Sequence, residues 1–334
     1  AGVKYLILGA VSSAFMIYGI ALVFGVAGSL QFDDLHAQQS ELIQSKVFLF
    51  GMLFLFAGLA FKISAFPFQV WAPDVYQGAP TPTTAFLAVG SKAAGFVLLI
   101  RLLVAAVPEV TAEWTSVLLV ISALTILYGN LCALPQRNLK RLLAYSGIAN
   151  AGYLLMGIVA QSEEGTVAIL YYLAGYLFTV MAAFMIINLL TKEGEGEDIS
   201  CLSGLSKRSP FLAFAMTLAA VSLAGIPPLA GFFGKFLLVK SVATEAFGNT
   251  YFFVLLAVAV FGVVVSIYYY FGIVRTIFWG RRKADEPTPT PVTIGLTVRI
   301  VLGCCVAAML YLGLLPNKPV KWAETAAKVE AASK

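Results

Sequence analysis

Four lysines lie inside or at the edge of long apolar stretches, where a positive charge is costly. They are Lys4, Lys62, Lys92 and Lys235. Lys92 is the clearest, because TTAFLAVGS precedes it and AAGFVLLI follows it, so its side chain cannot easily extend to a membrane surface. A lysine at the centre of a bilayer costs about 2.5–3.5 kcal/mol on insertion scales. Such residues face a protein interior or a water-filled cavity, and they mark ion pathways.

Two of these lysines stand close to prolines that interrupt a helix. Lys62 precedes Pro67, and Lys235 follows Pro227 and Pro228. Proline removes a backbone donor, and the freed backbone groups are tolerated at membrane depth only where protein or water satisfies them. Burial disfavours the charged form of a lysine, so a buried lysine can exchange a proton near neutral pH. The pattern therefore predicts a relay of lysines that moves protons through a membrane.

A static role is the alternative for each of these lysines. Lys62, Lys92 and Lys235 would then form structural ion pairs or extend to the surface, and Lys4 would lie at a membrane interface. No Asp or Glu lies deep in any expected span, and Asp74 is expected in a loop. We therefore expect the carboxylate partners of a relay outside this sequence, either upstream or on another subunit.

The stretches that hold these lysines are typical of a polytopic membrane protein. Of 334 residues, 60% are hydrophobic and 12% are charged, and the mean hydropathy is +0.89. A soluble domain carries about 25% charged residues. Because a spanning helix needs roughly 20 apolar residues, we predict about nine spans. They are 4–28, 47–71, 83–106, 115–134, 139–160, 166–191, 210–241, 251–279 and 292–315.

Charge placement decides the topology. The seventh span contains LAGIPPLAGFFGK and is counted as one broken helix. The loops near residue 137, at 192–208 and near 281 then share one side, and all three are rich in Lys and Arg. The positive-inside rule makes that side cytoplasmic, so that the C-terminus lies outside. Lys140 is either a basic anchor on the cytoplasmic side or a polar relay group.

Redox and metal cofactors are not expected in this chain. The four cysteines have no CxxC spacing, and His36, the single histidine, is expected in a polar loop. Haem, iron–sulfur clusters and multi-histidine metal sites need more ligands than these. The expected surroundings are a lipid bilayer, and no nucleic-acid partner is predicted.

Four motifs resemble a known family. They are FKISAFPFQVWAPDVYQGAPTPTTAFLAVGSK, NLKRLLAYSGIANAGYLL, YYLAGYLFTVMAAF and SLAGIPPLAGFFGKF. On these motifs the sequence is identified as a member of the antiporter-like membrane subunits of respiratory complex I, and WAPDVYQGAPTP points to the subunit N group. The resemblance covers residues 1 to about 315.

The resemblance implies an all-α polytopic membrane fold, an antiporter-like bundle of inverted repeats with two discontinuous helices. Residues 1–106 would form the C-terminal part of the first repeat and 107–279 the second repeat. Residues 280–334 would form the last transmembrane helix and a polar tail. The discontinuous helices would be the spans broken at Pro67 and at Pro227–Pro228.

The resemblance also implies roles for single residues. The proton-transfer lysines of the family correspond to Lys62, Lys92 and Lys235, and a further one to Lys4. The helix that carries the family's glutamate partner is not found, so the first half-channel is expected to be incomplete. Many relatives have a histidine where this sequence has Asn150. Asparagine can hydrogen-bond water but cannot carry a proton, so Asn150 is a possible polar relay group without a titrating role.

The predicted function is that of a proton-translocating membrane subunit of a complex I-type NADH:quinone oxidoreductase. Quinone reduction elsewhere would drive protons through the lysines, within a translocase whose NAD, FMN, iron–sulfur clusters and quinone belong to other subunits. Other membrane subunits would be its partners, and a bacterial inner membrane its location, with organelle or thylakoid membranes as options. The alternatives are an Mrp-type cation/proton antiporter subunit and a structural membrane subunit of a related hydrogenase or dehydrogenase.

Overall fold

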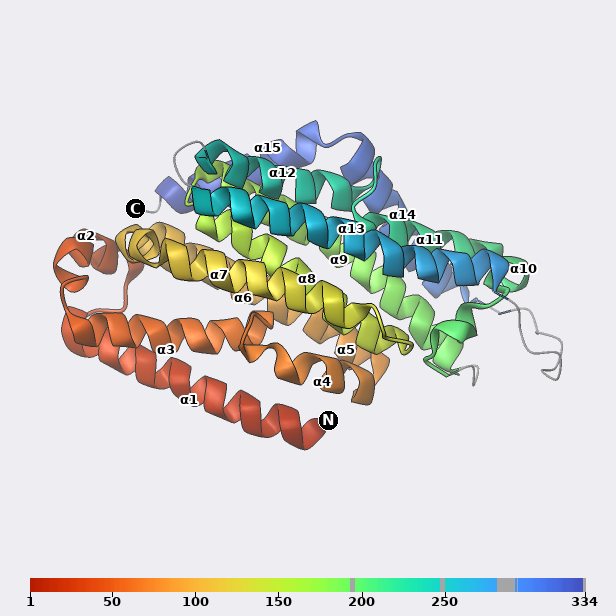
Figure 1. The fold of residues 1–334 in the computed structure, drawn as a ribbon, viewed down its shortest axis with the longest axis horizontal. Helices are drawn as coiled ribbons and strands as arrows, with labels where there is room; N and C mark the ends of the chain where they lie inside the picture. The colour runs from red at the N-terminus through yellow and green to blue at the C-terminus, as the bar shows by residue number, and fades with distance from the viewer. Residues whose placement is uncertain (193–195, 247–249, 281–291, 293, 333–334) are drawn as a thin grey trace.

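The computed structural model is a bundle of long helices that run roughly along one axis (Figure 1). It describes residues 1–192, 196–246, 250–280, 292 and 294–332, and these contain helices but no β-strand. The helices are α1 (Gly2–Ala27), α2 (Phe32–Leu42), α3 (Lys46–Ile63), α4 (Ala72–Gly78), α5 (Thr81–Phe86), α6 (Lys92–Leu99), α7 (Pro108–Ala133), α8 (Leu139–Val159), α9 (Glu163–Lys192), α10 (Leu205–Arg208), α11 (Pro210–Ala224), α12 (Ala230–Glu245), α13 (Thr250–Trp279), α14 (Leu296–Leu314) and α15 (Asn317–Ala332). Short 3₁₀ turns are η1 (Phe68–Trp71) and η4 (Ile199–Leu202), and π-helical turns are η2 (Leu87–Ser91) and η3 (Ile100–Ala106).

The helix lengths confirm an all-α, multi-pass membrane protein. Eight stretches among the described residues are long and apolar enough to cross a membrane. The expected span 210–241 is divided between α11 and α12, which have 15 and 16 residues and are each short for a crossing. The eight stretches and this broken pair together correspond to the nine expected spans. The fourth begins earlier than expected, at Pro108.

Two helices are interrupted at the expected prolines. α3 ends at Ile63 and is followed by Ser64, which has a left-handed backbone (φ +62°), and the chain passes Pro67 and η1 before α4 begins. The backbone N–H of Phe66 donates to the hydroxyl of Thr125 on α7, 3.0 Å away. α11 ends at Ala224 and is followed by Gly225 (φ +83°), and α12 begins after Pro227–Pro228. There Lys235 of α12 donates to the carbonyl oxygen of Leu223. In both places another element satisfies backbone groups that the break leaves free, as burial requires.

Helix α8 is the central element of the bundle. It contacts α4, α7, α9, α12 and α13, and every residue from 142 to 159 is buried. Small residues permit this close packing. A Cβ added to Gly129 of α7 would lie 2.3 Å from the backbone nitrogen of Ala149, and one added to Gly152 would lie 2.7 Å from that of Ile126. Small residues at helix contacts let backbones approach closely, which is how membrane helices gain packing energy.

The basic segment before α8 and the segment after α9 lie at the same end of the bundle, as the charge-based topology predicts. Asn138 and Asp198 form an isolated bridge that brings the basic loop before α8 to the segment after α9. A Cβ on Gly280 would lie 2.6 Å from the hydroxyl of Ser203, so the end of α13 is at the same place. α2 and the C-terminus lie at the opposite end (Figure 1). The basic cluster near 281 lies outside the described residues.

Two polar segments expected to be loops are helical. The segment with His36 forms α2, because Leu35 and Leu42 stand seven positions apart on one face and are both buried. Asp74 lies in α4, which continues the second span beyond its break.

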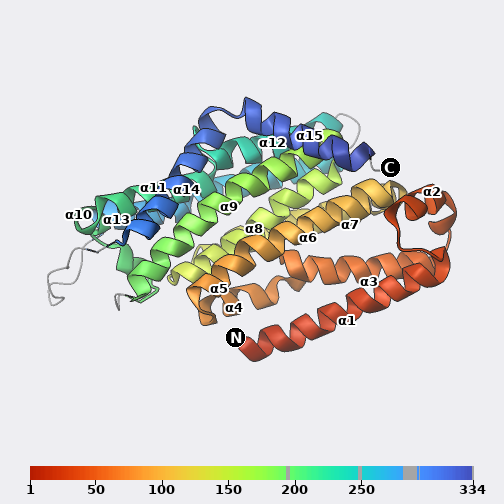
Figure 2. The ribbon, with the colours of Figure 1, turned by 180° about the vertical axis from the view of Figure 1, so that it is seen from behind.

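The C-terminal tail forms α15, which packs Ala323 and Ala327 against Tyr171 of α9. α1 lies alongside α3 at the edge of the bundle (Figure 2).

Candidate functional site

Lys92 lies in the interior, at the start of α6. Its side chain is 1% exposed, and η2 and η3 flank α6 on both sides. The ammonium group donates to the carbonyl oxygen of Gly147 on α8, and it lies 5.8 Å from the ring centroid of Tyr176 on α9. A Cβ on Gly147 would lie 3.2 Å from both the Nζ of Lys92 and the hydroxyl of Tyr176. The absence of a side chain at Gly147 therefore leaves room for the ammonium group. The π-helical turns on both sides of α6 are also a feature that is common at functional sites.

Lys235 lies at the second helix break. Its side chain is 4% exposed, and its ammonium group donates to the carbonyl oxygens of Leu223, at 2.8 Å, and Ala224, at 3.4 Å. These are the last carbonyls of α11, which carry the partial negative charge of the helix C-terminus. The Nζ also lies 5.0 Å from the ring centroid of Tyr153 on α8. The break thus supplies acceptors for a charged lysine without a carboxylate.

A group of buried polar side chains occupies the space between these lysines. The hydroxyl of Tyr172 on α9 donates to Oδ1 of Asn150 on α8, at 2.8 Å, and the amide nitrogen of Asn150 donates to the hydroxyl of Ser146, at 3.5 Å. Tyr172 and Tyr176 stack at 6.1 Å between ring centroids. A Cβ on Gly234 of α12 would lie 2.3 Å from the Tyr172 ring, so this phenol packs directly beside the turn that carries Lys235.

Further polar groups extend this network to α7 and α13. Ser146 of α8 is hydrogen-bonded to Tyr270, and Tyr269 donates to Oδ1 of Asn130 at 3.1 Å. The rings of Tyr269 and Tyr270 pack at 4.5 Å between centroids, and a Cβ on Gly262 of α13 would lie 2.6 Å from the Tyr153 hydroxyl and 2.8 Å from the Asn130 amide nitrogen. We call the set Lys92, Asn130, Ser146, Asn150, Tyr153, Tyr172, Tyr176, Lys235, Tyr269 and Tyr270 the polar core. It places polar side chains of α7, α8, α9 and α13 beside the two lysines.

The sequence reasoning named three members of the polar core and missed the tyrosines. Lys92 and Lys235 both contact α8, at Gly147 and at the Tyr153 ring, and Asn150 lies on that helix between the two contacts. Tyr172 and Tyr176 stand four positions apart, which places them on one helix face. Two tyrosines on one face of an otherwise apolar span could have indicated that this face contacts other polar side chains. Tyrosine in a membrane helix is ambiguous, since it also marks the lipid–water interface.

Lys62 lies in the last turn of α3, before the first break, and is half-buried. A Cβ on Gly95 of α6 would lie 3.8 Å from the Cβ of Lys62, and Gly95 is three positions after Lys92. Lys62 is therefore one helical turn from the polar core. Within the described part of the chain, no carboxylate is paired with it.

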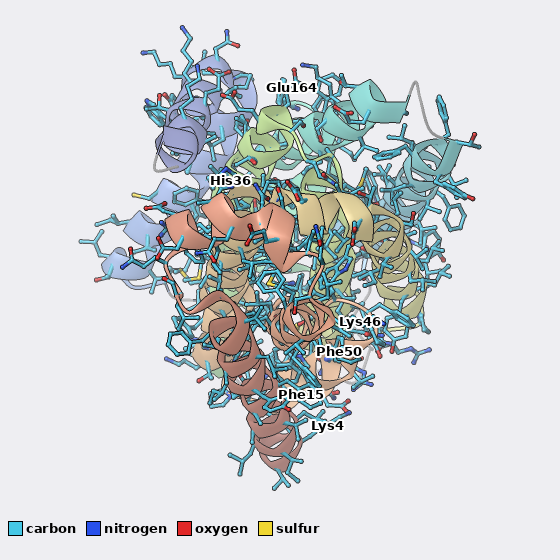
Figure 3. All side chains as sticks on the ribbon, turned by 90° about the vertical axis from the view of Figure 1, so that its left-hand side faces the viewer. Lys4, Phe15, His36, Lys46, Phe50 and Glu164 are labelled. Carbon is cyan, nitrogen blue, oxygen red and sulfur yellow. The ribbon has the colours of Figure 1, made fainter. Side chains whose placement is uncertain are left out.

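Lys4 and Lys140 both lie in ion pairs. Lys4 of α1 pairs with Asp74, which also accepts from Arg141 at 2.7 Å. Lys140 is 3% exposed, pairs with Glu197 at 2.6 Å and donates to the carbonyl oxygen of Ala79 at 2.9 Å. Lys4 thus has a carboxylate partner within the sequence, contrary to the expectation that such partners lie elsewhere. Figure 3 shows Lys4 on α1 at the edge of the bundle, away from Glu164.

Metal-ligating residues do not gather in the described ranges, where no group of three His, Cys, Asp or Glu side chains is suited to hold an ion. The side chains of the polar core include groups that can exchange protons. Lysine gains or loses one proton, and a phenol can accept a proton while donating its own.

Comparisons with known proteins find a family that matches most of this chain. The family described as "NADH:quinone oxidoreductase/Mrp antiporter, TM" matches residues 1–266. NADH-quinone oxidoreductase subunit N of Desulforamulus reducens is 39% identical over 329 residues, covering 98% of this chain and 67% of that protein. The chain therefore spans about two thirds of that relative's length.

Two solved structures are similar over nearly the whole chain. A chain of respiratory complex I from Thermus thermophilus with bound aureothin is 34% identical, with a TM-score of 0.76, and the match covers 96% of this chain and 67% of that one. A chain of the Mrp complex from Dietzia has a TM-score of 0.86 at 22% identity, covering 98% of this chain and 67% of that one. At that identity the second likeness shows a shared fold alone.

Proposed function

This chain belongs to the NADH:quinone oxidoreductase/Mrp antiporter transmembrane family, together with subunit N of NADH-quinone oxidoreductases, and from that membership we propose that it translocates protons in a complex I-type assembly. The observation that carries the proposal is the polar core, whose tyrosine rings lie beside both Lys92 and Lys235. NAD, FMN, iron–sulfur clusters and quinone would be held by other subunits of the assembly. Those membrane subunits would be its partners, in a bacterial inner membrane.

Both lysines are placed to hold a proton for a time. The charged form of Lys92 donates to the carbonyl oxygen of Gly147, and the charged form of Lys235 donates to two carbonyl oxygens of α11. Charge-assisted hydrogen bonds of this kind are stronger than neutral ones. The low dielectric of the interior disfavours the same charged forms, so the two effects oppose each other. A proton can therefore occupy either lysine in turn.

The tyrosines would pass the proton between the lysines. Lys92 would give up a proton and become a neutral amine, and Lys235 would take one up and become an ammonium ion. Tyr176 and Tyr172 would each accept a proton on one lone pair while donating their own, with water completing the chain. Asn150 carries no proton itself, but its amide oxygen orients the Tyr172 hydroxyl.

Coupling would come from the mutual repulsion of the lysine charges. Two like charges in a low-dielectric interior repel more strongly than in water. Loading Lys92 would therefore favour release from Lys235 toward the outer end of the bundle. Lys62, one turn of α6 away from Lys92, would supply protons from the cytoplasmic side. Redox events elsewhere in the assembly would time these steps.

A structural role for the same lysines accounts less well for their surroundings. Lys140 provides a comparison, since it is buried and has Glu197 as its counter-ion. Lys92 and Lys235 are equally buried, but among the described residues their partners are carbonyls and aromatic rings. A buried charge without a counter-ion is expensive, and it is kept where it functions.

Proton uptake by inverted membrane vesicles, driven by NADH and a water-soluble quinone, tests the proposal. The full complex would carry Lys235→Met or Lys62→Met, with assembly checked on native gels. Lys240→Met is the matched control, because Lys240 lies on the same helix but is exposed and pairs with Glu164 at 3.2 Å. We expect proton uptake and coupled quinone reduction to fall together in the first two variants and to stay at wild-type level in the control.

Wild-type uptake in assembled Lys235→Met and Lys62→Met complexes would overturn the proposal. The Mrp-type alternative makes a different prediction, because the same vesicles would then show sodium-dependent proton exchange without any electron donor. Its support is the shared fold with the Dietzia Mrp chain.

A further inference from the structure

We propose that Asp74 is a proton-exchange carboxylate at the cytoplasmic end of the path, held in place by Arg141 and paired reversibly with Lys4. The proposal rests on the function proposed above and assigns a residue outside the polar core. Its starting point is the position of Asp74, which lies in the half-helix α4 beyond the first break, and not in a loop.

Asp74 joins three helices through its two carboxylate oxygens. Oδ2 pairs with Lys4 of α1, and Oδ1 accepts from Arg141 of α8 at 2.7 Å. The side chains of the three residues are 39%, 38% and 31% exposed, in the order Lys4, Asp74 and Arg141, so they lie at the surface of this chain. A carboxylate that is fixed in position at the surface is within reach of proton carriers outside the bundle.

The two cations bound by Asp74 differ in chemistry. Arg141 keeps its charge at any pH a protein meets and presents a rigid fork of donors. It is itself fixed, because it donates to Oε1 of Gln77 at 3.2 Å and lies 5.8 Å from the Tyr145 ring centroid. Lys4 is a flexible point charge on an exposed helix end. Arg141 is therefore the positioning residue, and Lys4 is the partner that can leave.

The ion pair between Lys140 and Glu197 lies beside Asp74 in the fold and helps to hold α8 against α4. Lys140, the residue before Arg141, pairs with Glu197 and donates to the carbonyl of Ala79, just beyond the end of α4. The start of α8 is thus tied to the end of α4 independently of Asp74. Loss of the Lys4 contact can leave the position of Asp74 unchanged.

A line of aromatic residues leads from this cluster to the polar core. Tyr5 follows Lys4 in α1 and packs on Trp71 at 5.1 Å between ring centroids, and Trp71 contacts Tyr76 of α4 at 6.2 Å. Tyr76 is 2% exposed and contacts Phe184 of α9 at 6.3 Å between ring centroids. Tyr176, the ring beside Lys92, lies on the same helix.

Lys62 lies beside this line of aromatic residues. Its Nζ is 6.0 Å from the ring centroid of Phe61, which stacks on Trp71 at 5.1 Å. The titratable groups between Asp74 and Lys92 are therefore phenols and Lys62.

The exchange conserves charge and protons. A proton from cytoplasmic water adds to Oδ2 of Asp74, and the neutral acid no longer attracts Lys4, which moves away. Arg141 remains on Oδ1. The proton then leaves Asp74 along the phenols, with water between them, towards Lys62, which supplies Lys92. The carboxylate is regenerated, and Lys4 returns to it.

The test uses the NADH-driven vesicles described above, with Asp74→Asn, Asp74→Glu and Asp33→Asn in the assembled complex. Asp33 is the matched control, because it is an exposed carboxylate at the opposite end of the bundle. We expect Asp74→Asn to lower proton uptake by at least about tenfold, since a positioned proton-transfer group contributes about 100-fold or more. Asp74→Glu keeps an exchangeable group and should restore most of the rate, whereas Asp33→Asn should leave it unchanged.

An infrared difference spectrum taken on energising the vesicles gives a second readout. A protonated carboxyl band should appear in the wild type and move in frequency in Asp74→Glu. This measurement does not depend on the folding of Asp74→Asn, because Asp74→Glu keeps the charge and both cations. Absence of a band that responds to Asp74→Glu would overturn the proposal.

The kinetic outcomes separate this proposal from the broader one. Wild-type uptake in Asp74→Asn together with a loss in Lys92→Met and Lys235→Met would overturn only the role of Asp74. Wild-type uptake in all three would overturn the proposed function itself. An Asp74→Glu complex that assembles but is as slow as Asp74→Asn would also count against proton exchange, because side-chain shape alone would then matter.

Discussion

The ammonium nitrogen of Lys235 lies 2.8 Å from the carbonyl oxygen of Leu223, across the break between α11 and α12. The helix that ends there supplies the acceptor, and the helix that begins there supplies the donor. The lysine thus satisfies a backbone group that the two prolines leave without an intrahelical partner. The break supplies an acceptor for the charge of Lys235, and Lys235 supplies a donor for the free carbonyl at the break. A substitution at either place should therefore affect both.

Gly225→Ala should disturb Lys235 without touching its chemistry. Gly225 has φ +83°, and a Cβ there would lie 2.9 Å from Cδ of Lys235. A left-handed conformation costs a non-glycine residue about 1–2 kcal/mol, so we expect a lower melting temperature and slower proton uptake. Gly272→Ala on α13 is the control, because a Cβ there meets nothing within 4 Å. Thermal unfolding in detergent and vesicle uptake measure the two effects.

Gly147→Ala should separate proton transfer from stability. The added methyl would lie 3.2 Å from the Nζ of Lys92 and from the Tyr176 hydroxyl, which are flexible side-chain ends that can shift by a few tenths of an ångström. We expect normal assembly but slower proton uptake, because the ammonium group loses its approach to the carbonyl. Gly303→Ala, in an open position on α14, should leave uptake unchanged. Equal rates in both variants would show that the Gly147 carbonyl is not needed.

The hydrogen bond between Tyr172 and Asn150 should appear as coupling in a double-mutant cycle. Asn150→Leu leaves the buried Tyr172 hydroxyl without its acceptor, which should lower the free energy of unfolding by about 1–3 kcal/mol. Adding Tyr172→Phe removes that hydroxyl, so the double variant should recover part of the loss. Denaturation of each variant gives the interaction energy. Strict additivity would mean that the bond is not formed.

Removing the charge of Glu197 should be more costly than removing that of Glu164. Glu197→Gln leaves Lys140 buried without its counter-ion, and breaking a buried pair in this way costs about 3–5 kcal/mol. Glu197 is itself partly exposed, so the loss should lie at the lower end. Glu164→Gln removes an exposed pair with Lys240 and should cost less than about 1 kcal/mol. Similar melting temperatures for both variants would contradict this ranking.

Sequence reasoning succeeded where a local pattern determines structure. Apolar stretches of spanning length gave the helices, and the prolines at 67 and 227–228 gave the interruptions. The burial of Lys92 followed from the apolar residues on both sides of it. These features depend on a few neighbouring residues, which a sequence displays directly.

Other features depend on residues far apart in the chain. Lys4 and Asp74 are separated by 70 positions, and no local pattern pairs them. Ser146 is hydrogen-bonded to Tyr270, which is 124 positions away in the sequence. The residues of the polar core therefore could not be grouped from the sequence alone. α2 was missed because its many polar residues conceal two leucines that share one face. A sequence shows which residues are unusual, but the partners that explain them come from packing.

The complete burial of α8 has a consequence for biosynthesis. The ribosome delivers α8 to the bilayer before α9, α12 and α13, which later enclose it. Asn150 must wait for Tyr172, 22 positions downstream, and Ser146 for Tyr270. Until then the nascent chain presents polar groups and closely spaced glycines to lipid or to the insertion machinery. Assembly of this protein therefore depends on holding its most internal helix while the helices that cover it are still being translated.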